Sequence, residues 1–188
     1  MSTSTTFAPV SSAAAGQPLP ITPQELTTNA IDYLLWGTAL GSAALVQAVA
    51  PSLQGLPFQV AIAGAGLSAF AFHFYRGYRL PARSGQGEAV RLLRLATWVV
   101  LAVLPALVPK LGWATVLPLM LFAIGTRTFV AGGILQLRTL IFGGAAAWVF
   151  GSLALRFQAP TDQMLLLLAA AATALLVPGA VLRAAARR

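Results

Sequence analysis

The 188-residue chain contains no cysteine, only four acidic residues and a single histidine. The lack of cysteine excludes disulfides, thiolate nucleophiles, iron–sulfur clusters and zinc–thiolate sites. Catalysis normally needs a cluster of nucleophile, acid/base or metal-binding side chains. No three of the five acidic and histidine residues share a motif spacing, so the sequence predicts no catalytic residue, no metal site and no cofactor. We therefore expect a protein that is not an enzyme.

Charged residues are also scarce, at 9% of the chain, whereas hydrophobic residues make up 58% and the mean hydropathy is +0.81. Such a composition cannot provide a soluble globule with a polar surface. The length allows about six membrane spans of about 20 residues each, with short connections and no separate soluble domain. The composition thus predicts one integral membrane domain.

Six apolar runs follow one another along the chain, and we expect each to form a helix. The first begins near Pro23 and continues to about Ala50, and the others cover residues 57–75, 92–108, 113–137, 140–157 and 164–182. Three of the connections are short and rich in proline, as is typical of turns between antiparallel neighbours. The expected fold is all-α, with six transmembrane helices forming three antiparallel hairpins within residues 23–188.

The segment before the first run, residues 1–22, is rich in Ser, Thr, Ala and Pro and lacks any basic residue. We expect it to be a disordered tail, because it holds too little apolar surface to offset the entropy of ordering. The order should begin at Thr22 as an N-cap, with Pro23 at the first helical position and Glu25 completing a capping box. Ile21 and Leu26 would form the accompanying hydrophobic staple.

The basic residues are distributed unequally between the two ends of the expected spans. Nine arginines lie on the side of the second connection and the carboxyl terminus, against two basic residues on the other side. With six spans, this bias predicts that both termini and the arginine-rich connection lie in the cytoplasm. We expect Arg76, Arg79 and Arg83 to contact anionic lipid of the inner leaflet, and we expect no binding of nucleic acid. For this count, Arg91 and Arg94 are assigned to the second connection.

Small residues recur every four positions at two places in the expected helices, at Gly37 and Gly41 and at Gly143, Ala147 and Gly151. This spacing predicts closely packed helix pairs. Packing within one chain is favoured over dimerisation, while a homo-oligomer or a larger membrane complex stays open.

One charge, Arg127, lies inside the apolar stretch "LFAIGTRTFVAGG", near the middle of the bilayer. A charge at this depth costs about 2.5 to 3.5 kcal/mol, and such residues usually face a cavity or a partner. Arg127 therefore marks either an anion site or gate, or a structural arginine that snorkels to the cytoplasmic face or binds carbonyl groups. Thr126 and Thr128 beside it could bond backbone carbonyls. Asp32 is the nearest acidic residue by depth, and an ion pair with it would be structural.

The remaining candidate, His73, lies in the aromatic sequence "FAFHFYRGYR" at the cytoplasmic end of the second run. An interfacial structural histidine is the favoured interpretation. A pH-sensitive element on the cytoplasmic side is the alternative. Arg127, Asp32 and His73 together form the hypothetical ligand or ion site.

The expected three hairpins, the "GGILQL" and "PGAVLRAAARR" endings and the stretch "FVAGGILQLRTLIFGGAAAWVFGSLALRFQAP" resemble HdeD-like short-repeat bacterial inner-membrane proteins. The resemblance covers about residues 31–188. It implies an inner-membrane protein tied to stress or acid tolerance, and it supplies no catalytic residue. We therefore expect a non-enzymatic membrane component of this kind. A small transporter or channel with an anion site at Arg127 is the alternative.

Overall fold

The computed structural model describes residues 22–53, 55–77, 85–157 and 159–187, and in these ranges all regular structure is helical. The long helices α1, α2, α3, α5 and α6 cover Pro23–Val49, Leu56–Gly77, Gly85–Ala106, Trp113–Leu135 and Arg138–Arg156. A sixth long helical segment consists of α7 (Pro160–Ala171), the π-helical segment η3 (Ala172–Leu176) and α8 (Val177–Ala185). Two short helices, η2 (Pro51–Leu53) and α4 (Val108–Leu111), lie in the connections.

The start of α1 confirms the predicted capping box. The hydroxyl of Thr22 accepts a hydrogen bond from the backbone N–H of Glu25, and the Glu25 carboxylate accepts one from the backbone N–H of Thr22. Pro23 occupies the first turn, where its missing N–H costs nothing. Ile21 of the expected staple and the expected tail before it lie outside the described residues.

Four helical segments are long and apolar enough to cross a membrane: Leu56–Tyr75, Trp113–Leu135, Arg138–Arg156 and Pro160–Ala185. Many large apolar side chains on these segments face outward, among them Leu67, Phe70, Phe142 and Leu165. An outward apolar surface of this kind suits contact with lipid and would be unusual for a soluble monomer.

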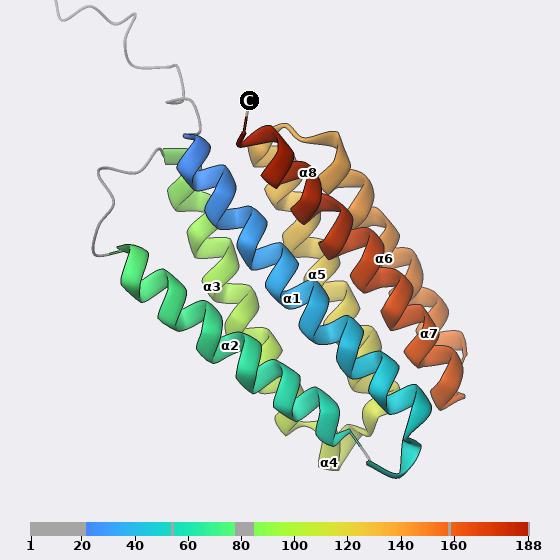
Figure 1. Ribbon diagram of the computed structural model, residues 1–188. Helices are drawn as coiled ribbons and strands as arrows, with labels where there is room; N and C mark the ends of the chain where they lie inside the picture. The colour runs from blue at the N-terminus through green and yellow to red at the C-terminus, as the bar shows by residue number, and fades with distance from the viewer. Residues whose placement is uncertain (1–21, 54, 78–84, 158, 188) are drawn as a thin grey trace, which may run out of the picture.

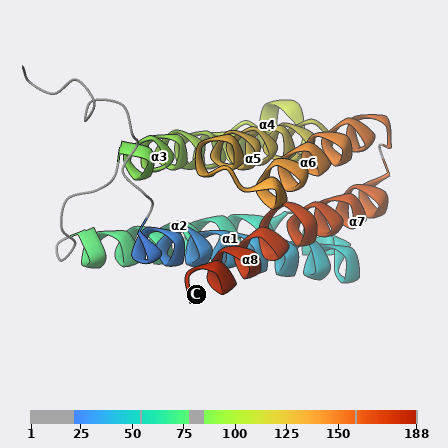
Figure 2. The same cartoon turned by 90° about the horizontal axis from the view of Figure 1, so that it is seen from above.

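The long helices form two layers (Figures 1 and 2). One layer contains α2, α1 and the α7–α8 segment, with α1 in the middle, and the other contains α3, α5 and α6, with α5 in the middle. In Figure 1, the start of α1 and the end of α8 lie at the same end of the bundle, which we call the terminal end. The most extensive contacts join α5 to α6 and α1 to the α7–α8 segment. Packing is therefore not restricted to the pairs of helices expected as hairpins.

Glycines allow the closest approach between helices. A Cβ atom added to Gly144 of α6 would lie 2.5 Å from the backbone nitrogen of Phe129 and 2.7 Å from the backbone oxygen of Gly125, both in α5. Gly125 and Gly144 were not among the glycines singled out in the sequence. Two of the glycines that were singled out also lie in close contacts. Gly37 of α1 packs on Leu175 and Leu176, and Gly143 of α6 packs on the backbone near Thr173, so both glycines contact the last long segment of the same chain.

The last long segment is interrupted by a π-helical turn directly before Pro178. A proline has no N–H and its ring displaces the carbonyl four residues earlier, so a wider turn accommodates it. The turn lies against α1, where a Cβ on Gly37 would approach Leu176 to 2.7 Å and one on Gly179 would approach Leu34 to 2.9 Å. The interruption therefore coincides with a close contact between α1 and the last segment.

Candidate functional site

The two central helices of the layers are joined by an ion pair between Asp32 of α1 and Arg127 of α5. The Nη2 group of Arg127 donates a hydrogen bond to Oδ2 of Asp32. Both residues are buried, with 2% of Asp32 and 4% of Arg127 exposed. The guanidinium carbon of Arg127 also lies 5.0 Å from the ring centroid of Tyr33, within the range of a cation–π contact. Arg127 thus remains buried inside the bundle and does not snorkel to its surface.

His73 of α2 is the third member of this cluster. Its Nε2 atom lies 3.8 Å from Oδ1 of Asp32, and its ring packs 5.5 Å from that of Trp98 in α3. The His73 side chain is 18% exposed while that of Asp32 is fully buried. The structure therefore brings Arg127, Asp32 and His73 together, and His73 has the most exposed side chain of the three, although its Nε2 atom is buried.

Arg94 extends the cluster and corrects a sequence prediction. We assigned it to the second connection, but α3 begins at Gly85, and Arg94 lies within the helix with only 7% exposed. Its Nη1 atom lies 3.5 Å from Oδ1 of Asn29 in α1, and its guanidinium carbon lies 6.0 Å from the ring centroid of Trp98. A second arginine therefore lies at the same end of the bundle interior as Arg127.

A helical spacing in the sequence could have revealed this position. Val90, Arg94, Thr97 and Leu101 follow one another at intervals of four, three and four residues, and all four are buried. Such intervals place side chains on one face of a helix. By contrast, Arg91 lies off this face, about two-fifths exposed, and forms a local ion pair with Glu88 at 3.0 Å. Because Arg94 is charged, we assigned it to a connection and not to the inner face of α3.

Several buried polar atoms around the ion pair make no hydrogen bond with the described residues. They include Oδ1 of Asp32, Nε2 of His73, the hydroxyls of Tyr33 and Thr128, and the indole N–H groups of Trp36 and Trp98. A buried polar group without a partner costs about 1–3 kcal/mol. The two hydroxyls and the two indole N–H groups can donate, whereas Oδ1 of Asp32 can only accept, so the interior offers more donors than the carboxylate alone can use.

The two threonines beside Arg127 behave differently. The hydroxyl of Thr126 donates to the carbonyl of Phe122 at 2.9 Å and accepts from the indole of Trp148 at 3.3 Å. The expected bond to a backbone carbonyl is therefore confirmed for Thr126. Thr128 lies in the bundle interior, and no such bond is found for it within the described ranges.

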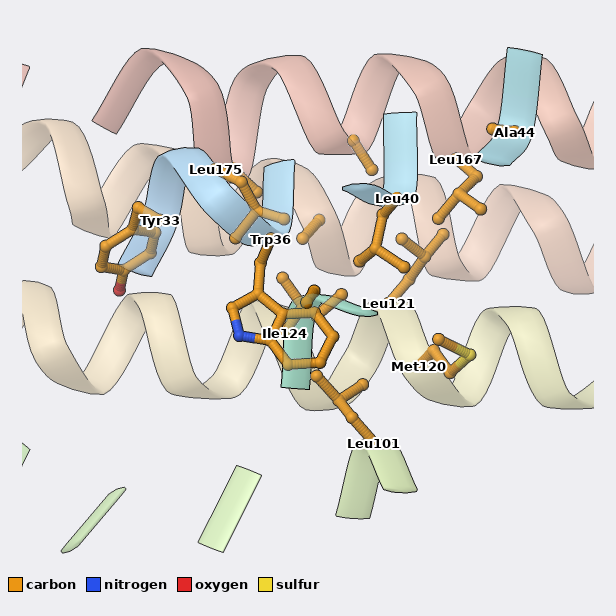
Figure 3. Packing of buried hydrophobic residues seen from close by; sticks show 14 of the residues in the cluster. Tyr33, Trp36, Leu40, Ala44, Leu101, Met120, Leu121, Ile124, Leu167 and Leu175 are labelled. Carbon is orange, nitrogen blue, oxygen red and sulfur yellow. The ribbon is translucent and has the colours of Figure 1, made fainter. Parts of the chain in front are cut away.

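Apolar side chains close the bundle beyond the cluster (Figure 3). Moving along α1 from Tyr33, the interior is filled by Trp36 and Leu40 of α1 and by Ile124, Leu121 and Met120 of α5. None of these side chains is more than 4% exposed. A solute that entered at the terminal end would meet this apolar layer before it could reach the opposite end.

This arrangement can hold the two helix layers together, and its stability depends on both charges of the ion pair being present. A buried ion pair is strongly destabilised when one partner is lost, because the other charge stays buried without compensation. The pair offers no nucleophile, and no group of three His, Cys, Asp or Glu residues able to hold a metal ion occurs in the described part of the chain. His73 is the third ionisable side chain of the cluster, with Nε2 3.8 Å from Oδ1 of Asp32.

Comparisons with protein-family models, with curated proteins and with solved structures found no match to this chain.

Proposed function

We propose that the chain is a non-enzymatic inner-membrane protein with six spans and both termini in the cytoplasm, acting as a membrane component in stress or acid tolerance. Four spans are supported by length and composition. The other two would be α1, about 40 Å long, and α3, about 33 Å long, which exceed the hydrophobic thickness of about 30 Å. These two helices carry Asp32 and Arg94, whose charges are turned into the bundle and not toward lipid.

The observation that carries this proposal is the buried ion pair of Asp32 and Arg127. It joins the middle helices of both layers, and its two charges neutralise each other inside the bundle. Neutralisation favours a structural function for Arg127 over an anion site, because a bound anion would have to compete with the carboxylate of Asp32. The resemblance to HdeD-like proteins supports the assignment to stress or acid tolerance.

A small transporter or channel is the second candidate, and the position of His73 favours it. A proton taken up by this partly exposed side chain would place a second cation 3.8 Å from Oδ1 of Asp32. Arg127 and Arg94 are the other charged groups around Asp32, and both would be repelled by the new charge. Acidification could then release Arg127 from its partner and free it to bind an anion.

Anion and proton flux in proteoliposomes would distinguish the two functions. Flux is compared between about pH 4 and about pH 8 for the unmodified protein, for Arg127→Gln and for Arg138→Gln. Arg138 is an exposed arginine at the start of α6 and serves as the matched control. All three proteins are reconstituted at equal density.

We expect no flux from any of the three proteins at any pH, because the ion pair is structural and an apolar layer closes the bundle beyond it. Flux that grows on acidification and disappears in Arg127→Gln, but persists in Arg138→Gln, would overturn the structural function and establish the transporter.

A further inference from the structure

A cavity of about 460 Å³ lies at the end of the bundle opposite the terminal end. It is bounded by the last turn of α1, the connection before α2, α4 and the first turns of α5 and α7. Its walls are mostly apolar and include Phe58, Val108, Trp113 and Met164. Small-molecule sites usually have volumes of about 300–1,000 Å³, so the cavity is large enough for one small ligand.

Two glutamines hold the walls of this cavity in place. The Gln47 amide accepts from the backbone N–H of Gly55 at 2.8 Å and donates to the carbonyl of Pro51 at 3.2 Å. Gln163 is 3% exposed, and its Nε2 group donates to the carbonyls of Ala114 at 3.2 Å and Ala154 at 3.1 Å. Gln47 thus joins α1 to the connection before α2, and Gln163 joins α7 to α5 and α6, so two separate sets of hydrogen bonds hold the cavity walls before any ligand arrives.

Gly55 and Trp113 fit together at the edge of the cavity. Gly55 has a φ of +85°, in the left-handed region that favours glycine. A Cβ atom at this position would lie 2.1 Å from Nε1 of Trp113, so only glycine lets the indole lie against the turn. Phe58 packs on the same indole at 5.2 Å between ring centroids. The wall formed by the aromatic rings is therefore fixed in its position.

Three polar groups of the cavity-lining residues make no hydrogen bond with the described residues: Oε1 of Gln163, the indole N–H of Trp113 and the hydroxyl of Thr161. Both hydrogen bonds of the buried Gln163 side chain use its Nε2 group, and its Oε1 atom accepts none from the described residues. The indole N–H of Trp113 likewise donates to no described residue. None of the described side chains that line the cavity is charged. The wall thus presents a few uncharged polar groups and a large apolar surface.

We propose that this cavity binds one uncharged amphipathic molecule, whose hydroxyl or similar head bonds to Gln163 and Trp113 and whose apolar body packs on Phe58, Val108 and Met164. A charged ligand is disfavoured, because no opposite charge in the wall would compensate for the loss of its hydration. The site lies about 22 Å along α1 from Asp32, beyond the apolar layer, and is therefore independent of the proposed function of the ion pair.

The lack of cysteine allows a direct test by protection of single engineered thiols. Thr161 lies at the cavity wall, whereas Thr115 is an exposed threonine in the first turn of α5 that does not line it. Thr161→Cys and Thr115→Cys are each reconstituted as full chains in vesicles of phosphatidylethanolamine and phosphatidylglycerol. The thiols are modified with methyl methanethiosulfonate, which is uncharged. The rate of modification is measured in the absence of additive, in the presence of octan-1-ol and in the presence of octanoate.

We expect octan-1-ol to slow modification at position 161 by about tenfold, in a saturable manner, and to leave position 115 unchanged. Octanoate, which has the same length and a charged head, should not protect. The additional substitution Ala48→Trp, which fills the cavity, should abolish the protection by octan-1-ol. Equal slowing at both positions, or protection that survives Ala48→Trp, would overturn the site. Equal protection by octanoate would overturn the choice of an uncharged ligand.

Discussion

Asp32 and Arg127 are separated by 95 positions in the chain, yet they form one ion pair inside the bundle. Each comes from the middle helix of its layer, so the pair connects the middle helices of the two layers. In a membrane, where packing between helices gains little from the hydrophobic effect, such a polar contact is well placed to determine how the layers are aligned.

The ion pair should show strong coupling in a double-mutant cycle. Arg127→Met should lower the free energy of unfolding by about 3–5 kcal/mol, because it leaves the charge of Asp32 buried without a partner. The double variant Asp32→Leu/Arg127→Met removes both charges and should be more stable than Arg127→Met alone. Reversible unfolding by a denaturing detergent in mixed micelles measures these values. Losses that simply add would mean that the two side chains do not act as a pair.

The contact between α5 and α6 should depend on Gly144. Gly144→Ala would place a methyl group against the backbone of α5 at Phe129, and we expect it to cost about 1–3 kcal/mol in the free energy of unfolding. Gly133→Ala is the matched control, because nothing lies within 4 Å of the added atom. That control should be neutral or stabilising by up to about 1 kcal/mol, as expected for alanine in a helix. Equal losses in both variants would contradict the close packing.

Thiol accessibility can decide the number of spans. Ser52 lies between α1 and α2, and Arg187 lies beyond α8. Six spans put five crossings between these positions and hence place them on opposite sides, whereas the four apolar segments alone would put them on the same side. In intact cells, we expect an impermeant maleimide to label Ser52→Cys and to label Arg187→Cys only after permeabilisation. Labelling of both from outside, or of neither, would rule out six spans with cytoplasmic termini.

The arginine-rich connection should retain anionic lipid. Arg76, Arg79 and Arg83 lie in or next to a stretch outside the described residues, and each basic residue near the surface contributes about 1 kcal/mol of attraction to an anionic leaflet. The triple substitution to Gln should reduce the phosphatidylglycerol that copurifies in mild detergent, as measured by mass spectrometry. The double variant Lys110→Gln/Arg156→Gln, at the opposite end, should have a smaller effect. The reverse order would contradict the predicted lipid contact.

Much of the fold could be predicted because it depends on local patterns. The capping box at Thr22 and the starts of the apolar helices follow from hydrogen bonds and hydropathy within a few residues. The predicted bounds differ from the structure at the end of α2 and most of all at the start of α3, because arginines near the end of an apolar run indicate a connection. Arg94 is instead buried among groups contributed by other helices, and no local pattern of charge distinguishes the two environments.

The sequence by itself determined the class of protein, the positions of the long helices and the suspicion that Arg127 needs a partner, since these depend on composition and helical periodicity. The tertiary structure decided that Asp32 is that partner, that His73 and Arg94 belong to the same cluster, and that Gln47 and Gln163 frame a cavity at the other end. These contacts join residues distant in the chain, and they depend on how the two layers pack. Periodicity places a side chain on a helix face, but only the packed bundle decides what that face meets.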